Sequence, residues 1–125
     1  MFGSILVNAS AHAGKPQVDS FDIQANGIDY RIFVAAPAEK APASGFPVVY
    51  MSDGNRMLPI AAKLMANNPQ FNAVFVGIGY PTEDKDEIVR LRYFDLTPPT
   101  PDELIPVQTN IPKTGGRDAF FNFID

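Results

Sequence analysis

Two short apolar runs mark the middle of the chain, and residues that break strands follow each of them. The first run, in residues 46–55 (FPVVYMSDGN), is apolar through Met51 and then ends at a Ser-Asp-Gly-Asn stretch. The second run covers residues 73–78 (AVFVGI), and Gly79-Tyr80-Pro81 closes it. Short runs rich in β-branched and aromatic residues predict buried strands of a parallel sheet.

A helical pattern separates the two runs. Residues 55–67 (NRMLPIAAKLMAN) place apolar side chains at helical spacing, namely Met57, Ile60, Ala61, Leu64 and Met65. Pro59 comes early enough for a first helical turn to tolerate it, and Asn67-Asn68-Pro69 ends the pattern. The order strand, helix, strand predicts a βαβ crossover with a parallel strand pair.

Two alternating segments precede this unit. Residues 20–24 (SFDIQ) and 30–36 (YRIFVAA) read as strands, and Asn26-Gly27 between them is typical of a tight turn. We therefore expect a β-hairpin. Residues 37–47, which are rich in Ala and Pro, predict an exposed connection to the first apolar run.

The sequence after the second run predicts two helices with an irregular segment between them. Residues 82–95 have acidic side chains early and Arg90 and Arg92 late, which suits the dipole of a short helix. Residues 96–116 hold five prolines and predict a long irregular excursion. Residues 116–125 predict a helix with an apolar face made of Ala119, Phe120, Phe123 and Ile124.

The first 19 residues differ from the rest. Ala11-His12-Ala13 has the form of a signal-peptidase site, but no Lys or Arg precedes the short apolar patch before it. We interpret residues 1–19 as a disordered leader or a misassigned start, with a degraded signal peptide as the alternative. Residues 20–125 would then form a partial domain. We expect a cytoplasmic location, which the absence of cysteine fits, with the periplasm as the alternative that the A-x-A leader suggests.

Composition narrows the function classes. The 125 residues are 46% hydrophobic and 19% charged, as in globular proteins. The net charge of −4 and the pI of about 4.8 argue against nucleic acid as a partner. The sequence has no cysteine, which excludes disulfides and thiolate sites, and no apolar run long enough for a membrane span. We expect no cofactor. We also expect no metal, because the cluster Glu83, Asp84, Asp86 and Glu87 lacks the spacing of a calcium loop.

Five segments together resemble a known family. They are YRIFVAAP, VVYMSDGN, AVFVGIGYP, RYFDLTPP and GGRDAFFNFI. The chain is similar over residues 20–125 to the first half of the α/β-hydrolase esterases that include esterase D, the mycolyltransferases and the siderophore esterases. The D-L-T-P-P run points to the siderophore-esterase branch. The resemblance implies an α/β fold in which a β-hairpin leads into a parallel three-layer αβα sheet, and a small-molecule ester substrate.

The catalytic motifs of that family are absent from these 125 residues. No G-x-S-x-G occurs, and the only histidine is His12, whereas in α/β-hydrolases the histidine comes last. We therefore expect a truncated serine ester hydrolase that is inactive alone. The alternatives are a small non-enzymatic α/β binding module and a truncated or frameshifted reading frame. A truncated fold would leave a sheet edge and the Phe-rich helix face uncovered, which favours self-association or aggregation.

One catalytic element falls within the chain. In the family, the backbone N–H after the Asp-Gly pair helps form the oxyanion hole, and here this is the N–H of Asn55. Gly54 would let the backbone turn tightly and a substrate approach. The alternative is a plain βα turn in which Asp or Asn caps the next helix. Asp53 would tie down the loop rather than act as a base.

Other polar residues have weaker roles on this interpretation. Arg56 and Arg92, and also Arg90, could face an anionic substrate, since catecholate siderophores are anionic. The alternative for each is a solvated surface position. Ser52 has no base within sequence reach and is not expected to be the nucleophile.

Overall fold

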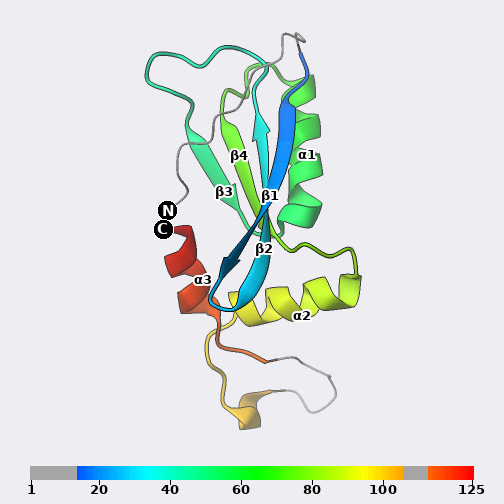
Figure 1. Ribbon diagram of the computed structural model, residues 1–125, viewed down its shortest axis with the longest axis vertical. Helices are drawn as coiled ribbons and strands as arrows, with labels where there is room; N and C mark the ends of the chain where they lie inside the picture. Colours follow the sequence, from blue (N-terminus) through cyan, green and yellow to red (C-terminus); the bar gives the residue numbers. More distant parts are fainter. Residues whose placement is uncertain (1–13, 106–112) are drawn as a thin grey trace. The chain divides into compact units, whose positions relative to one another are not determined.

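The computed structural model describes residues 14–105 and 113–125 (Figure 1). They form two compact units that divide after Pro81. We call residues 14–81 the sheet unit, and residues 82–105 with 113–125 the helical unit. The A-x-A site and His12 of the expected leader lie outside the described residues.

The sheet unit begins with the hairpin that the sequence predicts. Strands β1 (Gln17–Ala25) and β2 (Ile28–Ala36) pair antiparallel in a register that places Ala25 opposite Ile28. Asn26 (φ 54°) and Gly27 (φ 74°) form the turn, and positive φ at both central residues is what the favoured two-residue hairpin turn requires. Strand β1 starts three residues earlier than predicted, inside the range assigned to the leader.

The βαβ unit follows as predicted. Strand β3 (Val48–Met51), helix α1 (Gly54–Asn67) and strand β4 (Val74–Gly79) come in this order, and β3 pairs parallel with β4. Strand β4 also pairs antiparallel with β2, so the sheet is mixed, with the order β1-β2-β4-β3. Figure 1 shows α1 lying along this sheet, where it packs on β4 and β2.

The predicted strand within residues 46–51 forms and pairs parallel, but the prediction that it is buried was wrong. Val48, Val49 and Tyr50 are 49%, 41% and 46% exposed. The reason is position: β3 is an edge strand, and no strand among the described residues pairs with its outer side. An apolar run alone does not tell a central strand from an edge strand whose cover lies elsewhere.

The buried face of helix α1 matches the predicted one only in part. Leu58, Ala61 and Met65 are buried, and the two larger ones form a core with Ala35 of β2. Ala61 and Met65 were predicted correctly. Three other residues of the predicted face, Met57, Ile60 and Leu64, are 37–51% exposed. The helix is apolar on two sides, and the sheet lies on the Leu58 side.

The helical unit has the two predicted helices. Helix α2 (Lys85–Leu96) begins at Asp84, whose carboxylate accepts hydrogen bonds from the backbone N–H groups of Asp86 and Glu87. Such a cap satisfies donors that the first helical turn leaves open. The excursion after α2 contains a short 3₁₀ helix, η1 (Asp102–Leu104), and residues 106–112 lie outside the described residues.

Helix α3 (Arg117–Ile124) packs against α2. The connection is close at its start, where the N–H of Gly116 donates to the carbonyl of Phe94 at 2.9 Å and that of Gly115 to the carbonyl of Thr97 at 3.1 Å. The stretches RYFDLTPP and GGRDAFFNFI therefore meet within this unit. Of the predicted apolar face, Phe120 is buried and Ala119 is exposed.

Candidate functional site

The loop between β3 and α1 has an unusual backbone. Asp53, the residue just before α1, lies in the left-handed region with φ 58° and ψ 39°. Residues at this helix position normally have an extended backbone, and a non-glycine residue in the left-handed region costs about 1–2 kcal/mol. The Asp53 carboxylate does not cap the helix; its backbone carbonyl accepts from the N–H groups of Arg56 and Met57 at 2.9 and 2.8 Å.

Glycine allows this loop to press directly onto strand β4. A Cβ on Gly54 would lie 2.6 Å from the carbonyl carbon of Gly77 and 2.9 Å from its oxygen. Side chains two residues apart in a strand point to the same face, so Gly77 and Gly79 together leave that face of β4 open. The first turn of α1 occupies the space.

The side chain of Asn55 also links the start of α1 to the end of β4. Its Nδ2 donates to the carbonyl of Tyr80 at 2.8 Å, and its Oδ1 accepts from the N–H of Tyr80 at 2.8 Å. A Cβ on Gly79 would overlap Oδ1 of Asn55, so glycine is required there as well. We call these two hydrogen bonds the Asn55–Tyr80 pair. This role of the side chain was not predicted from the sequence, where a helix cap made by Asp or Asn was the alternative to the backbone role.

The structure brings some of the predicted site residues together. Gly54, Asn55 and Arg56 lie in the first turn of α1, where Gly54 is buried, Asn55 half-buried and Arg56 exposed. Arg92 is exposed on α2, in the helical unit. Arg90, also on α2, pairs with Glu87 at 3.7 Å. Among residues 14–105 and 113–125, no cluster of His, Cys, Asp or Glu could hold a metal ion.

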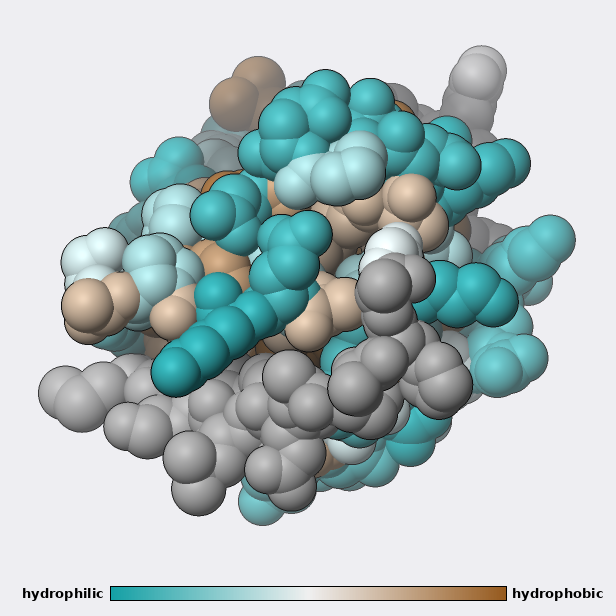
Figure 2. Space-filling model, turned by 90° about the horizontal axis from the view of Figure 1, so that it is seen from above, coloured by the Kyte–Doolittle hydropathy of each residue, from teal (hydrophilic) through white to brown (hydrophobic). Residues whose placement is uncertain are grey.

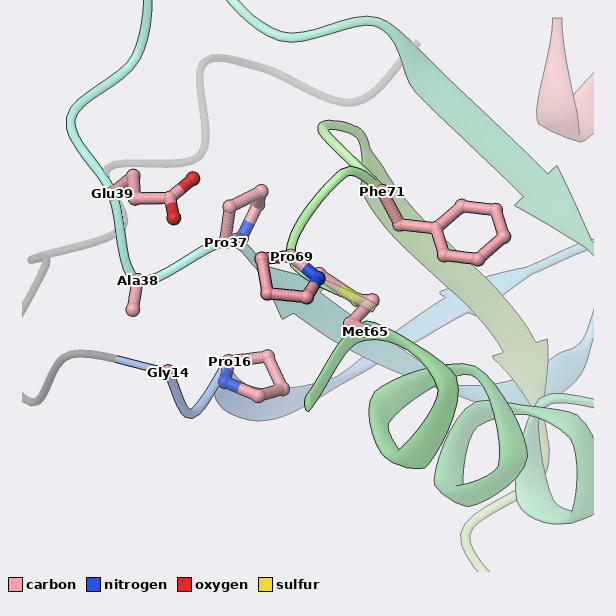
Figure 3. Close-up of a pocket in the computed structure, with 8 residues that line it drawn as sticks. All are labelled: Gly14, Pro16, Pro37, Ala38, Glu39, Met65, Pro69 and Phe71. Atoms are coloured by element: carbon pink, nitrogen blue, oxygen red, sulfur yellow. The ribbon is translucent and has the colours of Figure 1, made fainter. Parts of the chain in front are cut away.

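A shallow hollow lies at the other end of α1 (Figure 3). Pro16, Pro37, Pro69 and Met65 line its middle, with Glu39 on one side and Phe71 on the other, and Gly14 and Ala38 complete it. These residues offer one carboxylate and otherwise apolar or backbone surface. They are not the groups that ester hydrolysis needs.

The face in Figure 2 shows hydrophilic residues with smaller groups of apolar ones between them.

Comparisons with known proteins identify relatives of this chain. No protein-family model matches the sequence. The chain is 33% identical over 106 residues to the ferri-bacillibactin esterase BesA of Bacillus subtilis, which covers 77% of this chain and 36% of that protein. It is 29% identical over 113 residues to the apo-salmochelin esterase of Escherichia coli, covering 85% and 34%. The homologues of this chain are siderophore esterases.

The fold agrees with this relationship. The crystal structure of the BES protein from Bacillus cereus superposes with a TM-score of 0.74 and 26% identity, covering 100% of this chain and 48% of that chain. The fold is thus α/β-hydrolase-like, and the resemblance inferred from the five sequence segments is confirmed. The chain spans about a third of the length of the curated siderophore esterases that it matches.

The last observation concerns the length and hydrophobicity of the helices. None of the helices in the described part of the chain is long and apolar enough to cross a membrane.

Proposed function

We propose that this chain is part of a serine esterase that hydrolyses siderophore esters, and that the N–H of Asn55 contributes to its oxyanion hole. The observation that carries the proposal is the left-handed turn at Asp53, held onto β4 at the carboxyl ends of two parallel strands. Ligands of open α/β sheets bind at such strand ends. Backbone strain at such a position is a reason to look for function there.

The proposed chemistry needs a donor that is fixed before the reaction begins. In complete relatives, a serine would attack the ester carbonyl with histidine as its base, and two N–H groups would stabilise the tetrahedral oxyanion. The N–H groups of a first helical turn point out along the helix axis, at the positive end of its dipole. One such donor contributes about 3 kcal/mol of transition-state stabilisation.

The substrate contacts are part of the same proposal. Gly54 lets the loop lie against β4, and Arg56, exposed beside Asn55, offers a guanidinium to an anionic siderophore ester. Arg92 stays a candidate contact from α2. We also propose that the complete protein has helices on both faces of its sheet, as in the three-layer αβα fold.

A chimeric enzyme tests the proposal. The part of the Bacillus subtilis ferri-bacillibactin esterase that aligns with this chain is replaced by residues 17–125, and hydrolysis of ferri-bacillibactin is measured. We expect activity in the chimera and none in the 125-residue chain alone. A chimera with native circular dichroism and no activity would contradict the proposal.

The chain alone supplies the second half of this test. We expect no hydrolysis of p-nitrophenyl acetate above the solvent rate. Hydrolysis by the purified chain that a serine-directed phosphonate abolishes would show that the chain is catalytically complete. If the chain is a non-enzymatic binding module, neither the chimera nor the chain alone would have esterase activity.

A further inference from the structure

We infer that the side chain of Asn55 is a positioning residue, which holds its own backbone N–H in place through the Asn55–Tyr80 pair. The inference rests on the proposed function for its catalytic consequence. Its structural part depends only on contacts within the sheet unit.

The Asn55–Tyr80 pair begins where the β3–β4 ladder ends. The last residue pair of that ladder is Met51 opposite Gly77, and β3 then turns away into the loop. Tyr80, which follows β4, is 5% exposed, so both of its backbone groups need partners. The amide of Asn55 donates to one group and accepts from the other, as a neighbouring strand would.

The two hydrogen bonds restrain the helix start on the side that faces β4. They tie the second residue of α1 to the end of β4, while Gly54 lies against the Gly77 backbone. Asp53, one residue before Gly54, holds a backbone conformation that is unfavourable by itself. Loss of the Asn55–Tyr80 pair would remove two hydrogen bonds that oppose relaxation of this turn, and the direction of the Asn55 N–H would change as the turn relaxes.

Asparagine is the residue type that fits this position. Aspartate has the same shape but no donor, so Asn55→Asp would place a carboxylate oxygen against the carbonyl of Tyr80. Alanine removes both hydrogen bonds. Asn68, at the other end of α1, offers a matched control, because its Nδ2 donates to the carbonyl of Leu64 at 2.9 Å and it makes no contact with the loop among the interactions described.

Hydrogen exchange on the 125-residue chain at low micromolar concentration tests the structural part. We expect Asn55→Ala and Asn55→Asp to raise amide exchange in peptides covering residues 52–58 and 79–82 by roughly thirtyfold, as loss of two hydrogen bonds implies. Asn68→Ala should change only the end of α1. Unchanged exchange at the loop in both Asn55 variants, or an equal effect from Asn68→Ala, would overturn the inference.

Kinetics of the chimera test the catalytic consequence. We expect Asn55→Ala to lower kcat by roughly tenfold to a hundredfold and to leave KM within about twofold, since a misplaced donor acts on the transition state. Asn68→Ala should leave both constants unchanged. An unchanged kcat alongside raised loop exchange would make the amide merely structural and overturn the inference, although the proposed function would stand. An inactive, folded wild-type chimera would instead overturn the proposed function, and hydrogen exchange would then decide the structural part alone.

Discussion

Replacing Gly79 by alanine is the substitution that most directly strains the candidate oxyanion loop. The added methyl group would overlap Oδ1 of Asn55 and would lie 2.9 Å from its backbone nitrogen. Moving either of these Asn55 atoms is costly, because Oδ1 accepts a hydrogen bond from the N–H of Tyr80 and the backbone nitrogen belongs to the start of α1. We therefore expect Gly79→Ala to break the Asn55–Tyr80 pair.

The size of the effect follows from the groups affected. Two hydrogen bonds contribute about 2 kcal/mol together, and leaving the buried backbone groups of Tyr80 unsatisfied adds about 1–3 kcal/mol. Alanine in a strand gains about 0.5–1 kcal/mol over glycine. The free energy of unfolding should thus fall by about 2–4 kcal/mol.

Urea unfolding followed by far-ultraviolet circular dichroism measures this change. Ile78→Val is the matched control, since Ile78 is the neighbouring residue of β4, is 2% exposed and points to the opposite face. It should cost about 0.5–1.5 kcal/mol. A Gly79→Ala variant that loses no more stability than Ile78→Val would refute the reasoning.

A double-mutant cycle then isolates the contact itself. If the methyl group acts mainly by displacing the Asn55 amide, Gly79→Ala should cost less once Asn55 is already alanine. We expect an interaction energy of at least about 1 kcal/mol between the two positions. Additive effects would mean that the substitution acts elsewhere on β4.

Two further predictions concern the sheet edge and the hairpin. Val49→Lys should reduce light scattering by the isolated chain, because a charge on the exposed edge strand β3 opposes edge-to-edge pairing. The control Val89→Lys, on α2, should leave the scattering unchanged. Equal effects of the two substitutions would argue against pairing through β3. The hydrogen bond from Arg31 keeps the pKa of Asp22 below its ordinary value of 3.8, so the stability from this pair is present at neutral pH and is lost as the pH falls below that value. Asn in place of Asp22 should therefore lessen the drop in urea midpoint between pH 5 and about pH 2, and an unchanged drop would contradict this.

The sequence was most informative where local chemistry determines the backbone. Asn26-Gly27 allows few conformations other than the hairpin turn, so the hairpin was predictable. The breakers around α1 likewise bounded a βαβ unit. The burial of β3 was not predictable in the same way, because burial depends on which segments cover the sheet. Leu58 was missed for a related reason: the apolar pattern of α1 fits two faces, and only the position of β4 selects one.

The candidate site was predictable in outline but not in mechanism. Gly54 and Asn55 were identified from a family resemblance, and the loop does lie at the ends of β3 and β4. The left-handed backbone of Asp53 departs from the usual helix start and was not predicted, although Asp is among the residue types that tolerate this region. The side-chain role of Asn55 had one sequence signal, the V-G-I-G repeat of β4, because alternate glycines in a strand mark a close approach of another segment.

The central claim is that the N–H of Asn55 stabilises the oxyanion of an ester hydrolase. A crystal structure of the chimera, with a serine-directed phosphonate bound to the catalytic serine, tests it most directly. The account predicts a phosphonyl oxygen at about 2.7–3.1 Å from the Asn55 nitrogen, the distance at which oxyanion-hole donors act. A phosphonyl oxygen held by other groups, with the Asn55 N–H directed away from it, would contradict the account.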